Sequence, residues 1–521
     1  MNRILLYIFY GLCIPNWLLF RWRSKNIRLQ QENLLRRILK ESAKTSYGRT
    51  LSLNKSWTIR EYQKNVPMVQ YEDISEYITS QRLLDENQIC PGPIQCFEPT
   101  SGSSGAKKLI PYNTAILKSF AHLFKVWCAD LFIHGPSLQR GKIWYSVSPQ
   151  FAVGDSPSDG FEDDSEYLSG TSRKILKRFL PVDPRLKKVQ DSDDYFLILS
   201  CYLLSCEDLE AISIWNPSFL IRILEFIDDN KSLIVSTLEQ SHYHSQGIDF
   251  QFKTHPARLN WRRQEWKHSE LGPCLRIISC WDSAHAGMSA EAIRKAFPGV
   301  YVQGKGLLST ESAVTIPFVK AQGAVPIFDE LFFEFSCEET GTILLLDQLR
   351  EGKSYELIIS QKAGLLRYKT NDRIGVRSFY GTLPILDFIG RSGQVVDLCG
   401  EKLQLSRVQD ALQQLGYRED FLLLPLQSES VSRYQMVVPT EPNFSAGELD
   451  QMLCENHHYH LARKLKQLDS IEYLVDRTMR DTFTRFCMDQ KQMKLGDIKS
   501  AQLIKSVGEA RSFLEYRLNS C

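Results

Sequence analysis

The 521-residue sequence predicts an α/β protein with a large N-terminal domain of α/β layers and a β-meander, followed by a smaller α+β C-terminal domain. At roughly 100–200 residues per domain, this length accommodates two to four domains. Helical patterns come first, and β-rich runs then dominate from Leu275 to Val376. The pattern changes again after Gly390 and Gly393, whose flexibility suits a hinge. We therefore predict domains over residues 1–389 and 390–521.

The N-terminal part is predicted to be helical. The segment Ile4 to Phe20 is mostly apolar, but Pro15 interrupts it and basic residues flank it. It falls short of the roughly 20 apolar residues that a membrane-spanning helix needs. We expect a helix packed on the body of the protein, with peripheral contact at a membrane surface as the alternative. Residues Asn33 to Ser42 carry leucines on one face and predict a surface helix.

The middle of the chain alternates helices and strands. Gly154 to Glu166 is rich in Asp, Glu, Ser and Gly and predicts a solvated loop. Pro217 to Gln240 predicts one long helix with a single apolar face. Two strands follow, Leu275 to Trp281 and Gly299 to Leu308, separated by a helix over Ser289 to Phe297. A meander is predicted next, with runs at Leu331 to Phe335, Thr342 to Leu346, Tyr355 to Ser360 and Leu365 to Tyr368.

The C-terminal domain is predicted as a compact α+β unit. Ser406 and Gln409 have the spacing of a capping box that opens a helix closing at Gly416. Two β-rich runs come next, then a long helix over about Ala446 to Leu468, a strand at Ile471 to Val475 and a further helix.

Charge and cysteine content exclude some functions. The chain has 63 basic and 61 acidic residues, a net charge of +2, so no overall field recruits nucleic acid and an anion must be held locally. Thirteen scattered cysteines, none in a Cys-x-x-Cys pair, favour reduced thiols and a cytoplasmic protein. Cys454 with His457, His458 and His460 does not share one helical face, so we do not predict a metal site there.

The most informative segment is a loop of nine residues that combines hydroxyls, glycines and lysines. Glycines let backbone N–H groups turn inward, hydroxyls add donors and lysine adds a positive charge, so the loop can cradle phosphate oxygens. It is not a P-loop, because Lys107 stands where that motif needs glycine. The alternative without a binding function is an ordinary surface loop rich in serine and glycine. The residues are Thr100, Ser101, Gly102, Ser103, Ser104, Gly105, Ala106, Lys107 and Lys108.

Two further segments support a nucleotide site. Ser309, Thr310 and Glu311 follow a predicted buried strand, and a carboxylate beside phosphate oxygens is a natural magnesium ligand. Asp372, in the run Tyr368 to Asp372, has a carboxylate able to accept both ribose hydroxyls. Either acid alone is more often a solvated turn residue, but their order and spacing with the first loop favour function.

These three segments resemble the T-S-G-T-T-G-x-P-K, Y-G-x-T-E and Y-R-T-G-D signatures of the adenylate-forming superfamily, which includes acyl-CoA synthetases. More specifically, the chain is similar to the Gretchen Hagen acyl-acid amido synthetases, the auxin-responsive-promoter family, in a bacterial-type version. The phrases that carry this resemblance are A-I-S-I-W-N-P-S-F at 211–219, K-G-L-L-S-T-E at 305–311, G-E-K-L at 400–403 and K-L-G-D-I-K at 494–499.

The resemblance implies a reaction and a set of roles. ATP activates a carboxylic acid as an acyl-adenylate, and an amine, usually an amino acid, then displaces AMP. The first loop from Thr100 to Gly105 and Lys108 would hold phosphates, Glu311 would hold Mg²⁺, Thr310 would contact the nucleotide, and Asp372 would hold the ribose. The same resemblance implies that Asp282, Ser283 and Ala284 line the adenine pocket. It also implies that Arg391 contacts the nucleotide and that Lys499 is the lysine of a mobile C-terminal lid.

Two alternatives remain open from the sequence. The acyl group could pass to coenzyme A or another thiol, because a thiol channel leaves no short motif. The chain could instead be a catalytically inactive, membrane-associated binding protein, because Lys107 replaces the proline of the first signature, Leu307 and Leu308 replace the Tyr and Gly of the second, and the N-terminus is apolar. The acid, the amine and the oligomeric state are not determined by the sequence.

Overall fold

The structure is a computed structural model of the full chain. It describes all residues except 1, 85–86, 100–107, 140, 146–178, 190, 254–266, 284–285, 338–339, 392–394, 397, 399–400, 402, 428–431, 465–467, 492, 494–497, 499–502 and 520–521. The chain forms two compact units, and the division between them falls between Ile389 and Gly390. Each unit is described separately.

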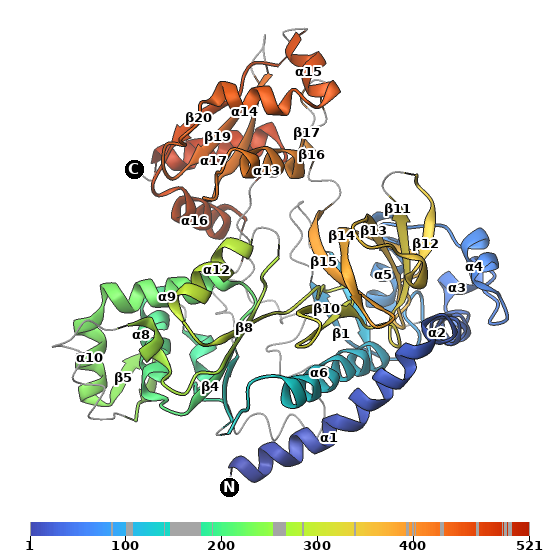
Figure 1. The fold of residues 1–521 in the computed structure, drawn as a ribbon, viewed down its shortest axis with the longest axis horizontal. Coiled ribbons are helices and arrows are strands. Elements are labelled where there is room, and N and C mark those ends of the chain that lie inside the picture. Colours follow the sequence, from blue (N-terminus) through green and yellow to red (C-terminus); the bar gives the residue numbers. More distant parts are fainter. Residues whose placement is uncertain are drawn as a thin grey trace. The chain divides into compact units, whose positions relative to one another are not determined.

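The first unit begins with helices. They are α1 (Asn2–Arg23), α2 (Ile27–Ser42), α3 (Ser46–Thr50), α4 (Ile59–Asn65), α5 (Tyr71–Leu84) and α6 (Thr114–His134). The predicted helix over 33–42 is therefore the second half of α2. Figure 1 shows α1 lying along α6, and α2 packs against β11 (Phe332–Cys337), a strand of the meander described below. A capping box at Thr58 and Glu61 starts α4.

A parallel sheet lies at the centre of the first unit's α/β part. Its strands, in the order β3-β4-β7-β8, are β3 (Lys142–Tyr145), β4 (Leu209–Ser213), β7 (Ile277–Cys280) and β8 (Tyr301–Gly304). The strands β4 and β7 are buried along their whole length, as expected for a sheet covered on both faces. The associated helices are α8 (Ser192–Ser205), α9 (Pro217–Asp229), α10 (Lys231–Gln240) and α12 (Gly287–Ala296).

The prediction of one helix over 217–240 is wrong, because the helix breaks at Asn230. This residue has φ −116° and ψ 26°, and its side-chain amide donates to the carbonyl of Phe226 at 3.0 Å. An asparagine side chain that bonds to nearby backbone competes with the helical ladder. The predicted strand over 299–308 is also shorter, since β8 ends at Gly304.

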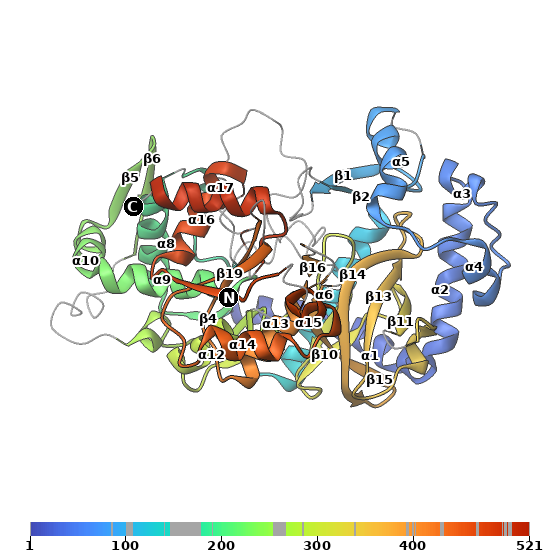
Figure 2. The same cartoon turned by 90° about the horizontal axis from the view of Figure 1, so that it is seen from above.

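The predicted meander is confirmed as a five-stranded sheet in the order β12-β11-β13-β14-β15 (Figure 1), and Figure 2 shows β11, β13, β14 and β15 from above. The strands are β11 (Phe332–Cys337), β12 (Ile343–Leu345), β13 (Ser354–Ser360), β14 (Tyr368–Tyr380) and β15 (Leu383–Arg391). Residues 365–367, predicted as part of a strand, form the buried connection that precedes β14. Antiparallel hairpins complete the unit: β1 (Ile94–Pro99) with β2 (Leu109–Asn113), β5 (His242–Ser245) with β6 (Ile248–Gln251), and β9 (Thr315–Phe318) with β10 (Gly323–Pro326).

The second unit is α+β, as predicted. A sheet in the order β18-β19-β20 contains β18 (Leu422–Gln427), β19 (Ser432–Val438) and β20 (Glu472–Val475). The remaining elements are β16 (Val395–Val396), β17 (Leu403–Gln404), α13 (Leu405–Gln414), α14 (Ala446–Leu453), α15 (His457–Lys464), α16 (Met479–Lys491) and α17 (Val507–Asn519). Apolar side chains on both faces of the sheet form its core.

Two predictions for this unit are wrong in detail. The helix over 446–468 is interrupted between Leu453 and His457, giving α14 and α15. The capping box at Ser406 does not form, because α13 already begins at Leu405 after Gln404, which makes no side-chain cap. Short 3-10 helices in the described residues are Ser24–Asn26, Pro184–Lys188, His268–Leu271 and Leu346–Gln348. Among the described residues, no helix is both long and apolar enough to cross a membrane.

Candidate active site

The first loop connects the two strands of the β1–β2 hairpin. Pro99 pairs with Leu109 at the end of this hairpin, so the loop spans a closed pair of strands. Residues 100–107 lie outside the described part of the chain, so the roles of Thr100, Ser101, Gly102, Ser103, Ser104 and Gly105 stay predictions. Lys108 is described and lies at the point where the loop returns to β2.

The Lys108 ammonium is directed toward the start of α5. Its Nζ lies 2.7 Å from Oε1 of Glu72 and 5.2 Å from the centre of the Tyr71 ring. The hydrogen bond from Lys108 holds the pKa of the Glu72 carboxyl below its ordinary value. The backbone N–H of Leu109 donates to the Tyr71 hydroxyl at 2.9 Å. The root of the loop is thus fixed to α5, and Lys108 must leave Glu72 to meet a phosphate.

Glu311 lies in a tight turn after β8. The turn is closed by the N–H of Ser309, which donates to the carbonyl of Ser312 at 3.1 Å. The Tyr112 hydroxyl on β2 donates to the carbonyl of Thr310 at 2.7 Å and so joins this turn to the hairpin. The half-buried Glu311 carboxylate makes no hydrogen bond or ion pair with the described residues. A carboxylate in that state suits Mg²⁺, which takes one or two protein carboxylates together with phosphate oxygens.

Asp372 lies near the start of β14, where the pairing with β13 shifts register between Glu356 and Ile358. Its N–H donates to the Thr370 hydroxyl at 3.1 Å, and that hydroxyl donates to the carbonyl of Leu357 at 3.1 Å. Asp372 is only 2% exposed. Asp372 is therefore buried on an inner strand of the meander and does not lie on an open surface.

Backbone hydrogen bonds bring the three predicted motifs together. The N–H of Lys369 donates to the carbonyl of Val69 at 2.8 Å, and the N–H of Val69 donates to the carbonyl of Arg367 at 3.1 Å. Residues 69–72 therefore contact the start of β14 on one side and the root of the first loop on the other. With Tyr112 bonded to Thr310, all three segments are anchored to one framework although they are far apart in the sequence.

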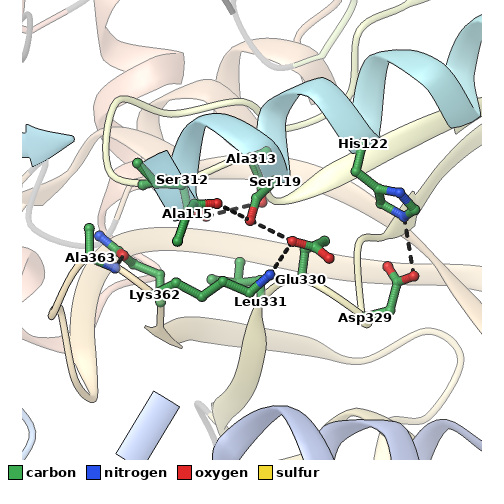
Figure 3. Close-up of polar contacts among 12 residues, drawn as sticks. Ala115, Ser119, His122, Ser312, Ala313, Asp329, Glu330, Leu331, Lys362 and Ala363 are labelled. Atoms are coloured by element: carbon green, nitrogen blue, oxygen red, sulfur yellow. Dashed lines mark hydrogen bonds and ion pairs between the residues drawn. The ribbon is translucent and has the colours of Figure 1, made fainter. Parts of the chain in front are cut away.

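Helix α6 is held beneath this framework by buried polar contacts (Figure 3). The Asn113 side chain caps the helix by accepting from the N–H groups of Ala115 and Ile116 at 3.0 Å. Ser119 donates to Glu330 at 2.6 Å, and Glu330 also pairs with Lys362. These contacts join α6 to the segment before β11 and to the connection between β13 and β14.

Asp329 contacts both His122 on α6 and Arg23 on α1. Nε2 of His122 and Nη1 of Arg23 each lie 3.1 Å from Oδ2 of Asp329. Burial raises the pKa of Asp329, but His122 and Arg23 outweigh it and bring the pKa below its ordinary value. Asp329 thus joins α1 to α6.

Asp282 and Ser283 lie at the carboxyl end of β7, where open parallel sheets bind ligands. Burial raises the pKa of the Asp282 carboxyl, opposed by Arg294, whose Nη2 lies 3.5 Å away. A Cβ at Gly304 on the neighbouring strand would lie 2.2 Å from Oδ1 of Asp282, so any other residue there would displace this carboxylate. Ala284 lies outside the described residues, and the predicted adenine contacts stay a prediction.

Lys305 is a candidate that the sequence interpretation missed. It follows β8 directly and is 7% exposed. Its Nζ donates to the Ser213 hydroxyl at 2.7 Å and lies 5.1 Å from the Trp215 ring and 5.9 Å from the Trp127 ring. The available signal is a lysine between two glycines at a strand end, Gly304-Lys305-Gly306.

An apolar pocket lies between the parallel sheet and helices α1 and α6. Ser213 and Trp127, both in contact with Lys305, belong to its lining. Almost all the other side chains there are hydrocarbon or aromatic, and the cavity volume is about 40 Å³, so it has room for a small apolar group. The lining residues are Leu6, Phe9, Tyr10, Trp127, Cys128, Leu131, Leu138, Ile143, Tyr145, Phe179, Ala211, Ile212, Ser213, Ile277 and Ser279.

The predicted residues around and beyond the domain boundary are less fully placed. Arg391 ends β15, and only its backbone is described. Lys499 lies outside the described residues. Glu401, from the G-E-K-L phrase, is fully buried and bonded to the Tyr434 hydroxyl, a contact that stabilises the second unit. Among the described residues, no group of three or more His, Cys, Asp or Glu is placed to hold a metal ion.

Known proteins resemble this chain in sequence. Indole-3-acetic acid-amido synthetase GH3.4 of Arabidopsis thaliana is 25% identical over 433 residues, covering 75% of this chain and 71% of that protein. The 4-substituted benzoates-glutamate ligase GH3.12 of the same organism is 21% identical, covering 73% and 71%. Jasmonoyl--L-amino acid synthetase JAR6 of Nicotiana attenuata is 21% identical, covering 71% and 70%. These homologues are acid–amino acid ligases.

Solved structures share the fold. The AtGH3.15 acyl acid amido synthetase in complex with 2,4-DB superposes with a TM-score of 0.80 at 20% identity, covering 97% of this chain and 96% of that one. A 2-hydroxyisobutyryl-CoA ligase in the postadenylation state gives 0.54 at 13% identity, covering 96% and 93%. The fold is therefore that of adenylate-forming ligases. The GH3 family N-terminal domain matches residues 20–302 and the GH3 family central domain residues 324–391, so this chain belongs to the GH3 family.

Proposed function

We propose that this protein is an ATP-dependent acyl-acid amido synthetase that joins a carboxylic acid to the amine of an amino acid. The single observation that carries the proposal is the framework of hydrogen bonds that unites the hairpin loop, the Glu311 turn and the start of β14. The proposal is also supported by homologues that are amido synthetases.

In the first half-reaction, a carboxylate oxygen of the acid attacks the α-phosphorus of ATP, and pyrophosphate leaves. The loop 100–105 and Lys108 hold phosphate oxygens, Asp372 binds the ribose, and Asp282 with Ser283 and Ala284 lines the base. Mg²⁺ bound when ATP is present would lower the charge on the phosphates, and Glu311 is the ligand with the right chemistry. The first unit is thus the adenylation domain.

In the second half-reaction, the amine nitrogen attacks the acyl carbon, the bond to the phosphate oxygen breaks, AMP leaves and the amine loses a proton. No protein nucleophile is needed. The second unit acts as a lid that carries Lys499 to the α-phosphate during adenylation, and Arg391 contacts the nucleotide beside the hinge.

The acid site is the apolar pocket beneath the parallel sheet. Its hydrocarbon and aromatic lining receives the apolar part of the acid, and Lys305 attracts the carboxylate at the polar end. A charged hydrogen bond contributes about 1.5–3 kcal/mol, or roughly 10–100-fold in binding. Lys305→Met should therefore raise KM for the acid by about tenfold or more and leave KM for ATP unchanged, whereas the exposed Lys295→Met serves as the matched control.

Product analysis tests the proposed reaction. The protein is incubated with ATP, Mg²⁺, an apolar acid and a panel of amino acids, and the products are identified by mass spectrometry. An ATP-dependent, hydroxylamine-resistant amide is expected. A hydroxylamine-sensitive product that needs coenzyme A would establish the thioester alternative. Failure to bind ATP–Mg²⁺ in calorimetry would establish the inactive binding protein.

A further inference from the structure

Helix α1 has one buried face that holds it to the first unit. Leu6, Phe9, Tyr10 and Cys13 are buried, and the Tyr10 ring stacks on Phe132 of α6 at 4.2 Å. Nε1 of Trp17 donates to Asp130 of α6 at 3.2 Å. These contacts fix which face of the helix turns outward, so the opposite face is a defined surface of the protein.

The outward face of α1 is apolar from Ile4 to Trp22 among the described side chains. A helix on the surface of a globular protein normally presents polar residues to water. Here the exposed positions recur at spacings of three and four residues, and none between 4 and 22 is charged or carries an amide. The large apolar side chains on this face are Ile4 (67% exposed), Tyr7 (46%), Ile8 (50%), Leu12 (50%), Leu18 (55%), Leu19 (40%) and Trp22 (64%).

The charges around this face have one sign. Residues 1–31 contain five basic residues and no acidic residue. Arg23 and Arg28 pair with Asp329 and Asp347. Arg21, which lies over the Tyr380 ring at 4.7 Å, and the exposed Lys25 form no ion pair with the described residues, and they flank Trp22.

We propose that the outward face of α1 binds an anionic lipid surface, with the helix lying in the plane of the interface. An apolar helix face with tryptophan, tyrosine and basic residues at its margin is what an interfacial helix needs, and adjacent cations add attraction to anionic headgroups. The GH3 match begins at residue 20, so most of this face lies outside the matched segment. The proposal is independent of the reaction above.

The test is flotation of the full-length protein with vesicles of phosphatidylcholine alone or with about 30% phosphatidylserine added. Wild type should float with the anionic vesicles and bind at least about tenfold more weakly to neutral ones, since each basic residue near such a surface contributes about 1 kcal/mol. The double variant Ile8→Gln/Leu12→Gln should lose at least about tenfold in affinity. Leu233→Gln, equally exposed on α10, is the matched control and should bind as wild type.

Two further measurements separate the outcomes. Brominated lipids should quench the part of the tryptophan fluorescence that Trp22 contributes, so quenching should be weaker in Trp22→Phe than in wild type. Unchanged melting temperatures should show that the variants fold. Equal vesicle binding by wild type and the double variant would overturn the proposal. So would a dimer in sedimentation velocity that the double variant abolishes while no form of the protein binds vesicles, because the face would then cover a second copy of the chain.

Discussion

The Tyr112 hydroxyl donates a hydrogen bond to the backbone carbonyl of Thr310 at 2.7 Å, across 198 positions of sequence. This contact connects the hairpin that carries the first loop with the turn that carries Glu311. It therefore sets the position of the proposed magnesium ligand relative to the loop that would hold the phosphates.

Tyr112→Phe should raise KM for ATP–Mg²⁺ several-fold, because the Glu311 turn loses its tether. The loss of one neutral hydrogen bond should lower the free energy of unfolding by about 1 kcal/mol, measured by denaturant titration. Tyr62→Phe is the matched control, since the buried Tyr62 hydroxyl bonds to Ser360 at 2.7 Å. A similar rise in KM for both variants would mean that the effect comes from stability and not from the tether.

Lys108→Ala should reduce ATP–pyrophosphate exchange by about 10²–10³, the effect of removing one preorganised donor from developing phosphate charge. Glu72→Gln should act in the opposite direction, because it removes the present partner of Lys108. An exposed ion pair contributes at most about 1 kcal/mol, so ATP should bind up to about fivefold more tightly. Lys107→Ala should matter less than Lys108→Ala, and equal losses at the two lysines would show that our register of the loop is wrong.

Asp282→Asn should lose activity and gain stability. Burial raises the pKa of this carboxyl, so the folded protein holds its proton more tightly than the unfolded chain does. Ionised Asp282 therefore destabilises the fold, and the penalty grows as pH rises through the interval between the unfolded and folded pKa values. The variant should melt at a higher temperature at neutral pH, with the difference shrinking as pH falls toward about 4. A variant less stable than wild type at neutral pH would contradict this.

Lys499→Ala should separate the two half-reactions. Negative charge builds at the α-phosphate only while pyrophosphate leaves, so a lid ammonium is needed for adenylation and not for aminolysis. The variant should lose ATP–pyrophosphate exchange by about 10²–10³ yet still convert a supplied acyl-adenylate and amine to amide. Exchange at the wild-type rate would mean that Lys499 is an ordinary surface lysine.

Local pattern was enough to predict the element types and the meander, because buried strands such as β13 alternate or run apolar in a way that few other structures do. It failed where a single side chain decides the backbone. Asn230 ends α9 through its own hydrogen bond to Phe226, and the break after α14 depends on capping contacts that periodicity does not report.

Only those residues of the candidate site that lie in sequence motifs could be predicted from the sequence. Glu311 and Asp372 are predicted because each lies in a recognisable phrase, K-G-L-L-S-T-E at 305–311 and the run Tyr368 to Asp372. Lys305 was missed because its environment is assembled from distant segments: Ser213 ends β4, Trp127 lies on α6 and Trp215 precedes α9. A cation buried between two indole rings is a result of tertiary packing, so no local sequence pattern predicts it.

The most direct test of the central claim is acid-dependent ATP–pyrophosphate exchange by the wild-type protein with a panel of carboxylic acids and Mg²⁺. We predict exchange that requires both the acid and Mg²⁺ and is fastest with acids carrying an aromatic or hydrocarbon group that fits the pocket beneath the parallel sheet. Absence of exchange with every acid, from protein that is folded and binds ATP, would contradict the proposed adenylation.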